Sequence, residues 1–291
     1  MVDYSIIVNN IETIKVLATQ GDADAQNKMG VCYERGIAGF PVDYEEAAKW
    51  FLKSAEQGYL KAQLNLANFY FKGKGGLPNY TKAAEWFMKA AEQGNAVAQS
   101  NLGYLYDCGK GVEQNLVRAF EYYEKAALQG ERISQTNVGY CYEHGRGVTK
   151  NFEKAFEWYM KAAEQGDDEA QTAIGVFYKM GTATTQDYEI SAKWFELAAK
   201  QGNARAQNFL AELYYYGKGV QMSIEKAFDL FKMAAFNGDI IAQYNLAGCY
   251  ERGDGIQKDY RQAAIWYSKA AEQGDEDAKS ALKRVEQYLW R

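Results

Sequence analysis

Residues 134–166 read SQTNVGYCYEHGRGVTKNFEKAFEWYMKAAEQG, and closely similar stretches recur along the whole chain. The stretch ends at Gly166, and equivalent glycines lie at positions 21, 58, 94, 130, 202, 238 and 274. The first interval between these glycines is 37 residues, and each of the other six is 36 residues. A fixed period of this length is typical of repeat proteins, in which neighbouring repeats bury each other's apolar faces. The pattern predicts seven repeats over residues 22–274, which form one continuous repeat domain.

Each repeat is expected to contain two helices. In the third repeat, Ala98, Leu102 and Leu105 lie at helical spacing in the first half, and Ala119 and Tyr123 do so in the second. The end segments 1–21 and 275–291 contain apolar residues at the same spacing, so we expect one capping helix at each end. The sequence therefore predicts sixteen helices, fourteen in the repeats and two in the caps.

The predicted helix boundaries carry the residues that helix ends prefer. A side chain that can accept hydrogen bonds from the first turn precedes every second helix, at Asp43, Asn79, Asn115, Asn151, Asp187, Ser223 and Asp259. Glu46 and Gln262 add the acceptor expected of a capping box in the first and last repeats. Glycines, which adopt the left-handed conformation at low cost, end the first helices at positions 36, 73, 109, 145, 181, 217 and 253.

Read together, the repeated positions resemble the Sel-1-like repeat, a relative of the tetratricopeptide repeat. The shared run is AQ-x-x-LG-x-x-Y, then G-x-G-V, then KA-x-x-W-x-x-KAAEQG, and all seven repeats follow it with local departures. One departure is Ala183, which replaces the second loop glycine of the fifth repeat. The resemblance implies an all-α fold, a right-handed α-solenoid, whose members usually act as adaptors or scaffolds within multiprotein complexes.

The expected function is therefore a non-enzymatic protein–protein interaction scaffold that binds a peptide or a partner helix on the concave face. An alternative is a regulatory subunit that activates a partner enzyme. A less favoured alternative is an enzyme that binds and hydrolyses β-lactams, as the cysteine-rich bacterial branch of the family does. That branch joins each helix pair by a disulfide, whereas none of the four cysteines here lies in a predicted second helix.

Composition and charge restrict the partners. Lys and Arg total 33 and Asp and Glu total 38, which gives a formal net charge of −5. A nucleic-acid binder needs a basic surface, so we expect a protein or peptide partner rather than nucleic acid. No run of 18 apolar residues and no secretory signal pattern is present, so the sequence predicts no membrane insertion and a cytoplasmic location.

No motif predicts chemistry. Cys32, Cys141 and Cys249 are about three repeats apart, too far for disulfide formation, and His144 is the chain's single histidine. A metal site would need several such ligands. We therefore expect no catalytic residue, no metal and no cofactor.

The first helices supply the candidate partner-binding residues. An asparagine occupies one equivalent position in three consecutive repeats, as Asn65, Asn101 and Asn137. Its amide can hold a peptide backbone, or it can instead bond to a neighbouring helix. Aromatic residues lie near it, and they either bind a partner or pack between repeats. This candidate site comprises the three asparagines with Phe71, Tyr104, Tyr140 and His144, and a second patch comprises Tyr215, Tyr216 and Tyr244.

Overall fold

The computed structural model describes residues 7–8 and 10–289, and within them it contains sixteen α-helices and no strand. The helices are α2 (Ile11–Thr19), α3 (Ala23–Arg35), α4 (Tyr44–Glu56), α5 (Leu60–Lys72), α6 (Tyr80–Glu92), α7 (Ala96–Cys108), α8 (Leu116–Leu128), α9 (Arg132–His144), α10 (Phe152–Glu164), α11 (Asp168–Met180), α12 (Tyr188–Lys200), α13 (Ala204–Tyr216), α14 (Ile224–Phe236), α15 (Ile240–Arg252), α16 (Tyr260–Glu272) and α17 (Glu276–Leu289). The predicted all-α architecture of helix pairs is confirmed.

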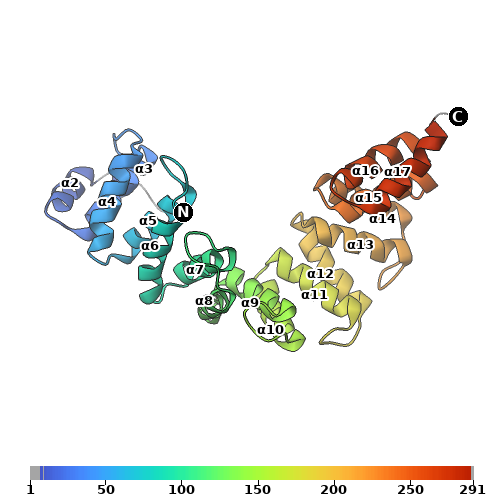
Figure 1. Cartoon of the computed structure of the whole chain (residues 1–291), viewed down its shortest axis with the longest axis horizontal. Helices are drawn as coiled ribbons and strands as arrows, with labels where there is room; N and C mark the ends of the chain where they lie inside the picture. The colour runs from blue at the N-terminus through green and yellow to red at the C-terminus, as the bar shows by residue number, and fades with distance from the viewer. Residues whose placement is uncertain (1–6, 9, 290–291) are drawn as a thin grey trace. The chain divides into compact units, whose positions relative to one another are not determined.

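The chain divides into two compact units, residues 1–150 and 151–291. Unit 1 contains α2 to α9 and unit 2 contains α10 to α17 (Figure 1). Within each unit, every helix packs against the helix before it and the helix after it in the chain. The division falls in the loop between the two helices of the fourth repeat. A single continuous domain over residues 22–274 stays a prediction.

The predicted capping residues begin the second helices. Each of the seven side chains accepts a hydrogen bond from the backbone N–H three residues further on, as Asn115 does from Arg118 at 3.0 Å. The seven glycines that follow the first helices all adopt the left-handed conformation. The second helices end two residues before their glycine, as at Glu56, and the glycine then turns the chain. Local capping therefore determines both boundaries of each loop.

The two predicted capping boxes form only by half. Asp43 caps α4 as expected, but its own backbone N–H donates to the carbonyl of Tyr33 at 2.9 Å. The same bond runs from Asp259 to Tyr250 at 2.9 Å in the last repeat. Because each N–H is already used to close the loop onto the first helix, Glu46 is left to pair with Lys49.

The second loop glycine allows consecutive repeats to approach closely. Gly147 has a φ of 71°, and a Cβ there would collide with the backbone carbonyl of Leu116 in the preceding repeat. The equivalent residue of the fifth repeat is Ala183, which keeps the left-handed conformation with a φ of 56°. A residue with a Cβ pays a conformational cost in this region. The fifth repeat therefore retains the loop geometry at the expense of backbone strain.

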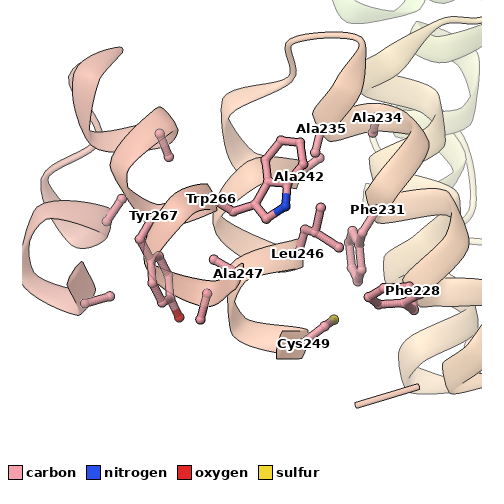
Figure 2. Close-up of a cluster of buried hydrophobic side chains, with 14 of the residues drawn as sticks. Phe228, Phe231, Ala234, Ala235, Ala242, Leu246, Ala247, Cys249, Trp266 and Tyr267 are labelled. Atoms are coloured by element: carbon pink, nitrogen blue, oxygen red, sulfur yellow. The ribbon is translucent and has the colours of Figure 1, made fainter. Parts of the chain in front are cut away.

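Small and large apolar side chains alternate in the core between helices. Figure 2 shows Phe231 of α14, Leu246 and Ala247 of α15 and Trp266 of α16 in one buried cluster of unit 2. Alanines from the same three helices fill the narrow places between the rings. Such alternation lets neighbouring helices approach closely while the rings fill the space between repeats.

Both ends of the described chain are covered by helices. In unit 1, Ile14 and Ala18 of α2 are buried against α3. The predicted N-terminal cap began earlier in the chain, and its residues 1–6 and 9 lie outside the described residues. In unit 2, α17 buries Ala278 and Val285 against α16, and Arg284 donates to Glu251 of α15.

Candidate functional site

The first helices α7 and α9 present one stripe of side chains to solvent. In α7 the buried side contains Ala98, Leu102 and Leu105, and the residue before each of them belongs to the adjacent, more exposed stripe, which has the same helical spacing. The outward stripe contains polar and apolar residues at equivalent positions of the two helices. We call this surface the first-helix face, and it consists of Val97, Asn101, Tyr104, Ile133, Asn137, Tyr140 and His144.

Apolar side chains on this face are exposed. Val97 is 51% exposed, Ile133 is 54% exposed and Tyr140 is 45% exposed. The residues equivalent to Val97 and Ile133 in the first two repeats are polar, namely Asp24 and Lys61. The exposed apolar area is therefore a property of α7 and α9 and is absent from the same positions of α3 and α5.

Tyr140 and His144 form an aromatic part of the face. Their rings stack with centroids 4.1 Å apart, and His144 Nδ1 lies 3.0 Å from the backbone carbonyl of Tyr140. Both residues are exposed. The pair therefore presents a flat, partly polar aromatic surface that a partner can contact without displacing any core residue.

Phe71 and Tyr104 are placed differently. Phe71 is half-buried, and its ring contacts those of Tyr80, Phe87 and Tyr104 at centroid distances of 5.6, 6.1 and 5.9 Å. The Tyr104 hydroxyl accepts a hydrogen bond from Lys110 Nζ at 2.7 Å. Of the alternatives left open by the sequence, packing between repeats describes these two rings.

The asparagine position forms no uniform ladder. Asn65 Nδ2 donates to Asn27 Oδ1 in the preceding repeat at 2.8 Å, and Asn245 donates to Asn208 at 3.0 Å. Asn101 instead donates to the carbonyl of Val97 in its own helix at 2.8 Å. Within residues 7–8 and 10–289 the side-chain oxygens of these three amides accept no hydrogen bond, and a peptide-binding role stays a prediction.

An ion pair joins the ends of the first helices. Arg146, in the loop after α9, donates to Asp107 of α7 at 2.6 Å. Lys74 makes the equivalent contact with Glu34 two repeats earlier, at 2.7 Å. These pairs hold each loop against the preceding first helix, at one edge of the first-helix face.

A glutamine relay, which we did not predict, connects consecutive repeats on the inside. Gln129, after α8, donates to Gln99 Oε1 at 2.7 Å, and Gln99 Nε2 donates to the carbonyl of Ala91 at the end of α6 at 3.3 Å. The same two bonds recur in the other repeats that lie within one unit, with Asn237 replacing glutamine once. The sequence signal was the paired AQ and EQG runs, which we used only as part of the repeat pattern.

The second patch, in unit 2, contains a pocket of about 290 Å³. Its lining comes from three helices and comprises Glu212, Tyr215, Tyr216, Phe231, Asn245 and Arg252. Two of the three predicted residues therefore line one cavity, whereas Tyr244 packs its ring on Tyr267 at 5.4 Å. The other polar lining residues, Glu212, Asn245 and Arg252, were not among the predicted residues. Polar residues also occupy the equivalent positions of other repeats, so their presence in the sequence did not indicate a cavity.

The cysteines show no sign of reactivity. Cys32, Cys141 and Cys249 are buried, Cys108 is exposed, and all four are free. Burial raises the pKa of Cys141 to about 12 and that of Cys249 to about 11. These two thiols are protonated at neutral pH, and a protonated thiol is a poor nucleophile and a poor metal ligand.

Two further features are absent from residues 7–8 and 10–289. No group of three or more His, Cys, Asp or Glu side chains there is arranged to hold a metal ion. No helix in that part of the chain has the length and apolar character needed to cross a membrane.

The fold and the exposed helix faces define a helical repeat protein of the kind that presents side chains of successive helices to other proteins. The Sel1 repeat model matches residues 23–59, 60–95, 96–131, 132–167, 168–203, 204–239 and 240–275. The chain belongs to the Sel1 repeat family, which confirms the resemblance seen in the sequence. Proteins built from these repeats generally mediate protein–protein interaction and are generally non-catalytic.

Solved structures agree with this assignment. The chain is similar to a protective antigen present in uropathogenic Escherichia coli strains, with 36% identity and a TM-score of 0.84, over 95% of this chain and 59% of that one. It is also similar to a Sel1 repeat protein from Oxalobacter formigenes, with 33% identity and a TM-score of 0.78, over 98% of this chain and 82% of that one.

One curated protein is similar over a short segment. Chitin synthase regulatory factor 3 of Schizosaccharomyces pombe is 38% identical over 66 residues, which is 23% of this chain and 7% of that protein. The chain therefore spans a small part of this relative and 59% of the Escherichia coli antigen.

Proposed function

We propose that this chain is a non-enzymatic interaction scaffold that binds a peptide or a partner helix on the first-helix face of unit 1, the face expected to be concave. The observation that carries the proposal is the exposure of Val97, Ile133 and Tyr140 on neighbouring first helices. A few residues, among which tyrosine is enriched, supply most of the binding energy in protein interfaces, and the contacts around them exclude water. A cytoplasmic location stays a prediction.

Polar residues surround these exposed apolar side chains. The ion pair of Asp107 with Arg146 lies at one end of the face, and Asn101 and Asn137 lie between the apolar side chains. An apolar centre with a polar rim is the usual composition of a specific interface. A partner with one or two apolar anchor residues, spaced to reach α7 and α9, fits this surface.

The test uses site-specific photocrosslinking. A benzoylphenylalanine introduced in place of Tyr140 should crosslink a partner in lysate of the native cells, because the ring is exposed and, among the residues that the structure describes, it stacks on the exposed ring of His144. The same probe in place of Glu121, an exposed residue on α8, is the matched control. A partner crosslinked equally from both positions, or from neither, would contradict the proposed site.

Substitution provides the second arm. Replacing Ile133 with serine and Tyr140 with alanine should abolish capture of that partner and leave the helical content unchanged, since both side chains are exposed. Tyr104→Ala is the wrong control here, because it also removes the contact with Phe71 and the bond from Lys110. Capture that survives the double substitution removes the site.

A second candidate function is a regulatory subunit that activates an enzyme on another chain. The similarity to the chitin synthase regulatory factor favours it, over the 66 residues that match. The measurement is the activity of any enzyme that co-purifies with the chain, with and without the chain present. Unchanged activity in a stable complex would leave the scaffold function alone.

A further inference from the structure

The pocket of unit 2 contains an arginine whose position is fixed from one side. Arg252 Nε donates to Asp254 Oδ2 at 2.6 Å, and the Tyr215 hydroxyl donates to the same oxygen at 2.8 Å. Asp254 follows α15, and Tyr215 belongs to α13, one repeat earlier. The guanidinium is therefore oriented by groups from two repeats before any ligand arrives.

A glycine makes room for this guanidinium. The positions equivalent to Gly248 carry a side chain in the other six repeats, namely Val31, Asn68, Tyr104, Tyr140, Val176 and Glu212. A Cβ on Gly248 would lie 2.8 Å from Arg252 Nη1 and 3.4 Å from its Cζ. Glycine inside a helix lowers the stability of that helix relative to alanine. The seventh repeat thus gives up helix stability at the one position where the guanidinium lies against the helix.

The two Nη atoms of Arg252 retain N–H groups that can donate hydrogen bonds to a ligand. Nη2 lies 3.5 Å from the Tyr215 oxygen, the limit of a hydrogen bond, and Nη1 makes no hydrogen bond in the described part of the chain. Arg284 provides the contrast within the same unit, because its Nε and Nη2 already bind the Glu251 carboxylate at 2.9 and 2.8 Å. A guanidinium edge with open donors matches the two oxygens of a carboxylate.

We propose that this pocket binds a carboxylate of a partner peptide on the Nη edge of Arg252. Phe231 and Tyr215 line the pocket, and Tyr216 at its margin is 65% exposed, so it can contact the residue next to the carboxylate. The proposal rests on the proposed function in one respect only, namely that the ligand belongs to another protein.

The charges around the pocket determine how strongly a carboxylate binds. Asp254 balances Arg252, and Glu212, which also lines the pocket, is paired with Lys179 at 2.6 Å. The site is therefore close to neutral, and geometry rather than net positive charge selects the ligand. Glu212 repels a bound carboxylate, so removing its charge should strengthen binding.

The experiment titrates the full chain with three short peptides and follows the Nε–Hε NMR signal of Arg252. This signal is assigned as the one that disappears in the Arg252→Lys variant. The first is acetylated and amidated with one central glutamate, and the second has neutral side chains and a free C-terminal carboxylate. The third is the amidated glutamine analogue of the first. We expect saturable shifts with one or both carboxylate peptides and none with the glutamine peptide, and the tighter binder shows whether a side chain or a chain end is the natural source.

Variants make the test specific, with binding followed on the Tyr216 ring signals. Arg252→Lys keeps the charge but loses the paired donors, and should weaken binding about tenfold or more. Gly248→Ala should weaken it severalfold, because the added methyl would collide with Arg252 Nη1 and push the guanidinium out of its position. Glu212→Gln should tighten it severalfold, and Arg284→Ala should leave it unchanged.

Three results would overturn the proposal. They are equal shifts with the glutamine peptide, equal weakening by Arg252→Lys and Arg284→Ala, and no shift with either carboxylate peptide up to about 20 mM, beyond the millimolar range of weak binding. Tyr140→Ala should not affect these titrations. Loss of the unit 1 site and loss of this pocket can therefore be told apart.

Discussion

The glutamine relay makes a quantitative prediction for Gln99→Met. The side chain is 6% exposed, donates to Ala91 and accepts from Gln129. Methionine has a similar volume and neither hydrogen-bonding group. Each lost hydrogen bond costs about 1 kcal/mol, so the two bonds together cost about 2 kcal/mol. The added apolar burial returns about 1 kcal/mol. We expect a net loss of about 1 kcal/mol of unfolding free energy.

The partner substitution tests whether the two glutamines act together. Gln129 is exposed, so water can replace part of its bond, and Gln129→Ala alone should cost about 0.5–1 kcal/mol. In the Gln99→Met background the same change should cost much less, because only the longer bond to the Lys125 carbonyl, at 3.3 Å, remains to be lost. Urea unfolding followed by far-ultraviolet circular dichroism gives these values, provided that the m-value stays constant.

Two results would refute the relay. One is a cost for Gln99→Met below about 0.5 kcal/mol, the range of ordinary surface substitutions. The other is an identical cost for Gln129→Ala in both backgrounds, which would mean that the bond contributes no coupling energy. Ser100→Ala, a half-buried neighbour on α7, is the control and should stay within about 0.5 kcal/mol of the parent.

Three further predictions concern strain, charge and modularity. Ala183→Gly should raise the unfolding free energy by about 0.5–1 kcal/mol by relieving the left-handed backbone, and equal or lower stability in a thermal melt would contradict the strain. Burial raises the pKa of Glu251, but the bonds from Arg284 and Tyr267 outweigh it, so the net pKa is lowered and the carboxylate contributes stability above its unfolded pKa of about 4.3. That contribution should be lost as pH falls through the lower folded pKa, and Arg284→Ala should show a shallower loss of unfolding free energy between about pH 5 and pH 3 than the parent. Deleting residues 95–130, one 36-residue period, should leave a folded helical chain with proportionally less helix, and a collapse of the circular dichroism signal would contradict nearest-neighbour stability.

Helix boundaries were predictable because local chemistry sets them. A side-chain acceptor such as Asn115 and a left-handed glycine such as Gly109 satisfy the ends of their own helices, whatever packs nearby. The period in the sequence then fixes how often such ends occur. The capping boxes failed for a nonlocal reason, since the N–H of Asp43 bonds to the preceding helix.

The candidate site was only partly predictable. Phe71 and Tyr140 are both aromatic residues near the exposed stripe, yet Phe71 packs against three rings while Tyr140 stacks only on His144. Whether such a ring is packed or exposed depends on the side chains that the next repeat places beside it. The residue type at a single position does not reveal those neighbours. The pocket was missed because Gly248 was treated as ordinary variation, and only the structure shows the arginine beside it.

The relay also bears on how such a chain can change in evolution. In the repeats that lie within one unit, an amide at the end donates to a glutamine oxygen, and a glutamine at the start donates to the helix end before it. These junctions therefore use the same connector, so one such copy can follow another. Duplication or loss of one period of the coding sequence leaves every internal junction intact. The number of repeats can then drift while the exposed residues of each copy diverge independently, and new binding specificities can arise without a new fold.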